Sequence, residues 1–197
     1  QQDFLAEFEA KNKRNQRSLF EYFASLLQQH RKLLLVRVDL SYKFDHVPTI
    51  KQFDQDIKRL TRRIQDKDTI FKGQVGYVYR LEQGVKSKGF HCHLLVIYNG
   101  SKHCSDGYLG QCIGELWQEQ ITSGDGQFFN CNQKAHKQKY QQSKQLGIGM
   151  IERDDGYAIS NAKEAMRYLA LPEKDDQYLR CRLAGMRAFS KGQYKRK

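Results

Sequence analysis

Apolar residues recur along this chain in two patterns, one typical of helices and the other of strands. A spacing of three to four residues marks four helical segments, and the first of them, interrupted by charged residues, predicts one long or two short helices. Thr49 and Ser160 are the expected N-caps of the second and fourth helices, because a hydroxyl at this position can accept a backbone N–H bond. The expected helices are residues 3–30, 49–64, 108–122 and 160–171.

Strand-like segments are shorter, rich in β-branched and aromatic residues, and bounded by turn residues. Residues 32–42 begin as a continuous apolar run, which is typical of a strand buried on both faces. Residues 76–84 and 89–98 are separated by a short linker and therefore predict an antiparallel hairpin. Between two shorter strands, the Gln- and Lys-rich residues 133–144 are expected to form an exposed, mobile loop. Those shorter strands are residues 127–131 and 146–152.

These elements together predict an α+β fold with a central, mainly antiparallel sheet and flanking helices packed mostly on one face. The 197 residues are enough for one domain with a sizeable core. We expect residues 1–31 to form a helical N-terminal arm and residues 32–197 to form the domain itself. The chain has two prolines and no apparent internal repeat, so no interdomain linker is predicted.

The hairpin carries the clearest candidate chemistry. His91 and His93 lie two residues apart on a strand, so both side chains project from one face, about 6 to 7 Å apart. Antiparallel pairing would bring Glu82, near the end of the preceding strand, beside both histidines. Two imidazoles and a carboxylate suit Mn²⁺ or Mg²⁺ and leave positions open for a substrate oxygen. The alternative is that both histidines are packed or hydrogen-bonded core residues without an ion.

The charge of the chain indicates a polyanionic partner. Lys and Arg number 34 against 22 Asp and Glu, giving a net charge of +12 that is spread along the sequence. A basic protein without any nucleic-acid role is the alternative. Arg37, Asp39 and Ser41 share one face of the strand over residues 32–42, which indicates either a site or a solvated sheet face.

Two further observations bear on the compartment. The sequence contains no run of 18 apolar residues, so we expect no membrane partner. Its five cysteines include no Cys-x-x-Cys pair, and an odd number of thiols without that spacing favours a reducing cytoplasm.

Three ordered motifs resemble those of the HUH endonucleases, the His-hydrophobic-His replication initiators and relaxases. These are Arg37-Val38-Asp39-Leu40, then Gly89-Phe90-His91-Cys92-His93 preceded by Glu82, and then a tyrosine on a downstream helix. More closely, residues 32–192 resemble the inovirus-type replication initiation proteins related to the filamentous-phage gene II nickase. The segments that carry this resemblance are Leu35-Val36-Arg37-Val38-Asp39-Leu40, Gly114-Glu115-Leu116-Trp117, Tyr168-Leu169-Ala170 and Lys174-Asp175-Asp176-Gln177-Tyr178-Leu179-Arg180.

The resemblance implies a metal-dependent, sequence- or structure-specific single-strand DNA endonuclease and strand transferase that initiates rolling-circle replication. A tyrosine would join covalently to the 5' phosphate, and because a phenol has a pKa of about 10, it needs a phosphodiester activated by a metal ion. The ion, Mg²⁺ or Mn²⁺, would be held by His91, His93 and Glu82.

The resemblance implies Tyr168 as the nucleophile, on the helix that Ser160 begins. Leu171 stands where many single-tyrosine members of the family carry lysine. Lys174 is therefore the candidate for that positive charge, if the chain folds back after Pro172. Tyr178 is an alternative nucleophile, or a second one as in two-tyrosine initiators.

The implied partner is single-stranded DNA or a DNA hairpin at a replication origin, in the cytoplasm of a bacterial host. The chain has no Walker sequence, so a host helicase and polymerase would be needed. Two alternatives remain: a catalytically inactive nucleic-acid-binding module of the same fold, or an HUH transposase or relaxase. The residues expected to contact nucleic acid are Arg37, Asp39, Arg80, Arg167, Arg180 and Arg187.

Overall fold

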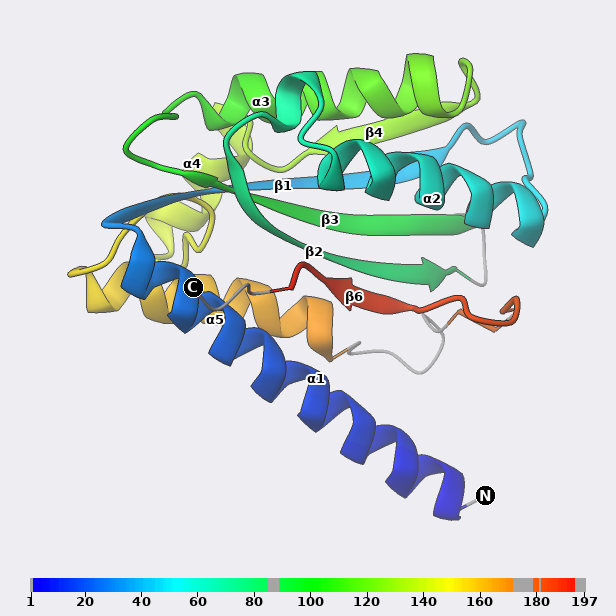
Figure 1. The fold of residues 1–197 in the computed structure, drawn as a ribbon, viewed down its shortest axis with the longest axis horizontal. Helices are drawn as coiled ribbons and strands as arrows, with labels where there is room; N and C mark the ends of the chain where they lie inside the picture. The colour runs from blue at the N-terminus through cyan, green and yellow to red at the C-terminus, as the bar shows by residue number, and fades with distance from the viewer. Residues whose placement is uncertain (1, 85–88, 172–178, 181, 194–197) are drawn as a thin grey trace.

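A computed structural model describes residues 2–84, 89–171, 179–180 and 182–193 and shows an α+β fold (Figure 1). Within these residues, six strands form one sheet in the order β4-β1-β3-β2-β6, and β5 pairs with β1. The pairings are antiparallel, as the sequence predicts. The strands are β1 (Lys32–Tyr42), β2 (Gln74–Gln83), β3 (Phe90–Asn99), β4 (Gly126–Asn130), β5 (Gly149–Glu152) and β6 (Phe189–Lys191).

The helices flank this sheet. The second helix begins where the sequence predicts, because the Thr49 hydroxyl accepts a hydrogen bond from the backbone N–H of Gln52. The third continues without a break into a π-helical turn, η2. The helices are α1 (Gln2–Gln29), α2 (Ile50–Gln65), α3 (Asp106–Glu115), α4 (Lys134–Gln142) and α5 (Gly156–Ala170), with short turns η1 (Thr69–Phe71) and η2 (Leu116–Ile121).

Helices cover both faces of the sheet, so the expectation that they pack mostly on one face is wrong. The reason is that β1 and β3 are apolar on both faces along part of their length. Leu34 and Val36 face α2, α3 and η2, and a core forms there around Phe53 and Trp117. Leu33 and Leu35 belong to a second core on the other face. Figure 1 shows α2 and α3 together on one side and α1 and α5 on the other.

The second core joins the N-terminal helix to the sheet. The C-terminal half of α1 buries Leu19, Phe23 and Leu26, and these residues share a core with Met166 and Leu169 of α5. Burying one such side chain fully stabilises the fold by about 1.5 to 3 kcal/mol. The N-terminal half of α1 projects away from the body of the molecule (Figure 1).

Two predicted elements differ from the structure. The segment expected to be a mobile loop, residues 133–144, is mostly helix α4; none of its residues is buried, so no apolar stripe marks it in the sequence. The last helix begins at Gly156 rather than at Ser160, because the Asp155 carboxylate accepts a hydrogen bond from the Ala158 N–H and caps the helix earlier.

The face of the sheet that carries α1 and α5 changes character along β1. Leu33 and Leu35 are fully buried beneath the helices, whereas Arg37, Asp39 and Ser41 follow on the same face and are only partly buried. The helical cover therefore ends partway along the strand. The polar residues beyond it form the candidate site.

Candidate metal centre

The register of the β2–β3 hairpin brings together the carboxylate and the two imidazoles. Glu82 pairs directly with His91, and Arg80 pairs directly with His93. Paired residues project from the same face of an antiparallel sheet, so Glu82 reaches both histidines. Gly84 donates its N–H to the Gly89 carbonyl, which holds the ends of the two strands together beside the site.

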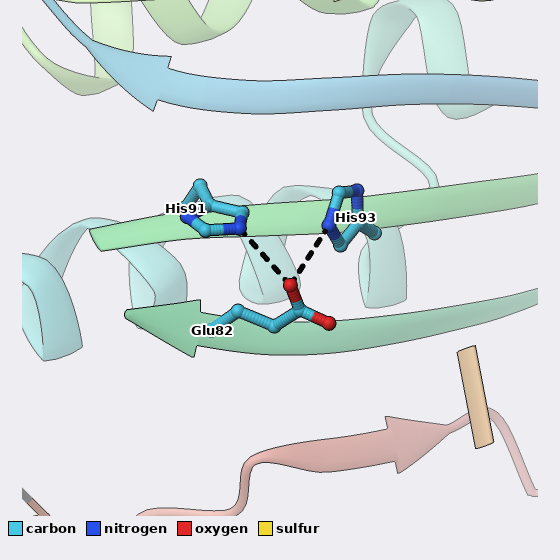
Figure 2. A group of neighbouring side chains, drawn as sticks. All are labelled: Glu82, His91 and His93. Carbon is cyan, nitrogen blue, oxygen red and sulfur yellow. Dashed lines mark hydrogen bonds and ion pairs between the residues drawn. The ribbon is translucent and has the colours of Figure 1, made fainter. Parts of the chain in front are cut away.

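One oxygen of Glu82 faces both rings. Its Oε2 atom lies 3.0 Å from His91 Nε2 and 3.3 Å from His93 Nε2 (Figure 2). The candidate donor atoms of the three residues all lie within 4.8 Å of one another. Neighbouring ligands of an octahedral Mg²⁺ ion, each about 2.1 Å from it, are about 3 Å apart. The three side chains therefore form a group that could hold a metal ion.

Glu82 is ionised in this environment. Its side chain is only 5% exposed, and burial alone would raise the pKa of the carboxyl group. The hydrogen bonds to His91 and His93, together with their charge, outweigh burial and lower the pKa of Glu82 to about 2. A buried carboxylate that stays charged needs a cation or strong donors around it.

Asp39 of β1 orients the second imidazole. Its Oδ1 atom lies 2.7 Å from His93 Nδ1, on the side of the ring opposite Glu82. Arg37 Nε lies 3.3 Å from the same oxygen. A carboxylate that accepts from Nδ1–H fixes the tautomer with Nε2 available for a metal, as in many metal centres. Asp39 thus supports the site rather than supplying one of the three converging donors.

Hydrogen bonds from a protonated His93 to Asp39 and Glu82 also stabilise this cluster. Burial would lower the pKa of His93, but the hydrogen bonds to Asp39 and Glu82 and their negative charges raise it to about 9. The imidazole is then a cation between two carboxylates. A metal ion would have to displace this proton, because only a neutral imidazole nitrogen can be a ligand. The donor set fits a divalent ion in charge and chemistry.

The tyrosine of the resemblance lies on a helix of this same sheet face. Tyr168 belongs to the last turn of α5, and its side chain is 44% exposed, with the Arg167 guanidinium 5.7 Å from its ring centre. Tyr168 lies about 200° around the axis of α5 from buried Met166, so it is on the side of the helix away from the core. Among the residues that the structure describes, no hydrogen bond joins Tyr168 to the three converging donors. Lys174 and Tyr178 lie outside the described residues.

The expected nucleic-acid residues fall in several places. Arg80 is buried and donates to the Ala170 carbonyl, so it joins β2 to the end of α5. Arg167 forms an ion pair with Glu164 at the surface. The Arg180 backbone N–H donates to the Gln83 side chain near the end of β2. Arg187 lies on the side of the sheet that α2 covers, opposite the candidate metal centre, where it lines a cavity with Tyr79 and Leu81.

Comparison with known families adds one result. Residues 7–159 match the model of the YagK/YfjJ C-terminal domain. The chain belongs to this family. The family match includes Glu82, His91 and His93 and ends inside α5, before Tyr168. A search of curated proteins gave no match. The resemblance to HUH endonucleases therefore rests on the motifs, with the His-x-His group present in the structure. No helix in the described part of this family member is long and apolar enough to cross a membrane.

Sequence reasoning missed two features of this region. The hydrogen bond between Asp39 and His93 was not predicted, and the polar triplet Arg37, Asp39 and Ser41 on an otherwise apolar strand was the available signal; the contact of Asp39 with nucleic acid stays a prediction. The sequence also does not predict the row of aromatic rings on β4 and α4, because the polar composition of residues 133–144 favours a loop over a helix. The spacing of four residues between His136 and Tyr140, which places both on one helix face, could have indicated it.

Proposed function

We propose that this chain is a metal-dependent, HUH-type single-strand DNA endonuclease and strand transferase. The observation that carries the proposal is the single Glu82 oxygen facing the Nε2 atoms of His91 and His93, with Asp39 behind His93. Glu82, His91 and His93 would hold Mg²⁺ or Mn²⁺. A packed core histidine pair would not need a buried carboxylate between the two rings.

The surroundings of the group support a role on a substrate rather than in the core. Glu82 is almost fully buried, but the His91 and His93 side chains remain 12% and 21% exposed. An ion held by a buried Glu82 and two partly exposed imidazoles would keep coordination positions open on the solvent side for a phosphate oxygen. The net charge of +12 favours a polyanionic substrate.

The reaction we propose is a transesterification. The ion, when bound, polarises the scissile phosphodiester as a Lewis acid. The Tyr168 phenolic oxygen forms a bond to phosphorus, and the bond from phosphorus to the 3' oxygen breaks. The phenol proton passes to solvent, and the departing 3' oxygen takes up a proton to become a hydroxyl. The 5' phosphate remains on the tyrosine, and attack by a 3' hydroxyl reverses the step and rejoins the strand.

Asp39 and Arg80 would act by positioning in this scheme. Asp39 keeps His93 Nε2 directed at the Glu82 oxygen. Arg80 donates to the carbonyl of Ala170, two residues after Tyr168, and so sets where the end of α5 lies relative to β2. Initiation of rolling-circle replication at an origin would be the biological use of such an activity.

The test is covalent capture of DNA. The full chain is incubated with 5'- and 3'-labelled single strands, including hairpin substrates, in Mn²⁺ and in EDTA, and products are separated on denaturing gels. We expect a Mn²⁺-dependent protein–DNA adduct that Tyr168→Phe and His93→Ala abolish. Tyr157→Phe is the matched control, because Tyr157 is also an exposed tyrosine of α5.

Other outcomes have definite meanings. An adduct that persists in Tyr168→Phe and disappears in Tyr178→Phe would move the nucleophile to Tyr178. Cleavage without any adduct would contradict the tyrosine mechanism and indicate that water is the nucleophile at the same metal site. Binding without cleavage on every substrate would contradict the enzyme and favour the inactive binding module.

A further inference from the structure

Three aromatic rings on β4 and α4 are in contact with one another beside the strand that supports the candidate metal centre. Phe129 of β4 is the cross-strand partner of Asp39, and Asp39 is in turn the partner of His93. Direct partners share a face, and adjacent strands are about 4.8 Å apart, so Phe129 lies two strands, about 10 Å, from His93. The Phe129 ring is 5.0 Å from the His136 ring, which is 5.2 Å from the Tyr140 ring.

The row is accessible. Phe129 is 48% exposed and Tyr140 is 43% exposed, although both are large aromatic residues. Solvent contact of this kind is costly for a phenyl ring, so an exposed aromatic cluster beside a polar site usually marks a binding surface. No described residue of α4 is buried, so the helix presents its rings rather than using them to fill a core.

The helix that carries two of the rings is fixed to the site by a partly buried polar network. Lys137 of α4 forms an ion pair with Asp106 at 2.6 Å, and Asp106 also accepts a hydrogen bond from Asn132. Asn132 Oδ1 accepts from the Arg37 backbone N–H, two residues from Asp39. Hence the rings keep a set position relative to Asp39 and His93.

The charge around the row is suited to a phosphate backbone. Lys134 and Lys139 are exposed on α4, and α4 contains no acidic residue. Burial and the charge of nearby Lys139 lower the pKa of His136, which favours the neutral ring. Basic side chains beside exposed aromatic rings are the usual composition of single-strand binding surfaces.

We propose that Phe129, His136 and Tyr140 form a base-stacking platform that holds unpaired DNA nucleotides beside the metal centre. This inference rests on the proposed function for the identity of the strand and adds the surface that binds it. Every base has an aromatic face, so stacking would tolerate many sequences, but it requires unpaired bases. The platform would therefore select single-stranded over duplex DNA.

Binding in the absence of metal tests the platform separately from catalysis. Fluorescence anisotropy in EDTA measures the Kd of the full chain for a labelled single strand and for a duplex of the same sequence. A 2-aminopurine base in the single strand reports stacking directly through quenching of its fluorescence. The variants are Phe129→Ala and Tyr140→Ala, with Tyr140→Phe as the conservative change that keeps the ring.

We expect each alanine variant to raise the Kd for the single strand at least about fivefold and to reduce the quenching, since stacking contributes about 1 to 3 kcal/mol per base. Tyr140→Phe should bind like the parent chain. Tyr108→Ala should do the same; it is the matched control, because Tyr108 is 69% exposed on α3, which packs on the opposite face. Unchanged melting temperatures would show that the variants are folded.

Two results would overturn the platform: single-strand affinity and quenching that both alanine variants leave unchanged, or a duplex bound as tightly as the single strand. Failure of the catalytic proposal looks different. If the parent chain forms no adduct yet shows ring-dependent single-strand binding, the endonuclease is contradicted and the platform stands. If adducts form while both alanine variants bind normally, the endonuclease stands and the platform is contradicted.

Discussion

His93 and Asp39 lie directly opposite each other on neighbouring strands, and His93 Nδ1 is 2.7 Å from Asp39 Oδ1. This contact leaves Nε2 of the same ring directed at Glu82 Oε2, 3.3 Å away. A side chain on β1 therefore determines how a ring on β3 meets a carboxylate on β2. The candidate metal centre depends on three strands, although its three donors come from two.

Removing the charge of Asp39 should weaken metal binding. We expect Asp39→Asn to raise the Kd for Mn²⁺, after correction for the proton that His93 must lose in each protein, about 10- to 100-fold, because partners that orient a ligating imidazole typically have effects of this size. Isothermal titration calorimetry measures the change. Asp54→Asn is the control, since Asp54 is a largely buried aspartate that pairs with Lys58 on α2, on the opposite face. Equal affinities for Asp39→Asn and the parent chain would contradict the orienting role.

Metal binding should release a proton from His93. Its pKa is about 9 in the absence of metal, so at pH 7 the imidazole is protonated and must lose its proton to become a ligand. Mn²⁺ affinity should therefore rise by about tenfold for each pH unit between pH 7 and about 8.5. Calorimetry in two buffers with different ionisation enthalpies counts the protons. A value near zero would mean that His93 is not displaced by the ion.

The stability of the metal-free protein should also depend on pH, with a sign set by His93. Its pKa is raised in the folded chain from 6.5 to about 9, so its contribution is fully present below pH 6.5 and is lost as the pH rises through 9. We expect the free energy of unfolding in EDTA to fall between pH 6.5 and 9, and the fall to be smaller in His93→Gln. Urea titrations at several pH values measure it. A slope unchanged by the substitution would contradict the assignment.

Arg80 should affect strand transfer more than metal binding. Its guanidinium donates to the Ala170 carbonyl at 3.3 Å, so Arg80→Met should free the end of α5 and displace Tyr168. We expect the rate of adduct formation to fall about tenfold or more, because small displacements of a reacting group are costly. Mn²⁺ affinity should change less than about twofold. Arg62→Met, an exposed arginine on α2, is the control.

An equal loss of metal affinity and of adduct formation in Arg80→Met would show that Arg80 maintains the centre itself. That result would contradict a role limited to α5.

The Asn132 network should be a measurable part of fold stability. Asn132 is 1% exposed; it donates to the Leu35 carbonyl and to Asp106 and accepts from the Arg37 N–H. Asn132→Ala removes all three of these hydrogen bonds, although Asp106 keeps its ion pair with Lys137, and the change should cost about 2 to 4 kcal/mol of unfolding free energy. Urea unfolding measures this change. Asn161→Ala, which removes one surface hydrogen bond to Lys144, should cost less than about 1 kcal/mol.

Much of the fold follows from local patterns in the sequence. The bounds of β1 are those predicted, because its apolar run and flanking polar residues are unambiguous. The hairpin of β2 and β3 follows from two apolar segments joined by a short linker, and it places Glu82 beside His91 as expected. The α+β class is confirmed by the mostly antiparallel sheet and its flanking helices.

What could not be predicted depends on contacts between distant segments. The pairing of Asp39 with both His93 and Phe129 is set by the order β4-β1-β3, and no local pattern specifies that order. Helix α4 is anchored by Lys137 and Asp106, 31 residues apart, rather than by an apolar stripe. The three candidate metal ligands were therefore accessible from sequence, whereas Asp39's contact with His93 and the aromatic row of Phe129, His136 and Tyr140 were not.

The most direct measurement of the central claim is electron paramagnetic resonance of Mn²⁺ bound to the full chain, with pulsed detection of nitrogen couplings. We expect one tightly bound ion per chain with imidazole nitrogen couplings, and we expect both the binding and the couplings to be lost in the His91→Ala, His93→Ala double variant. A bound ion without nitrogen couplings, or equal binding by the double variant, would contradict a metal centre at Glu82, His91 and His93.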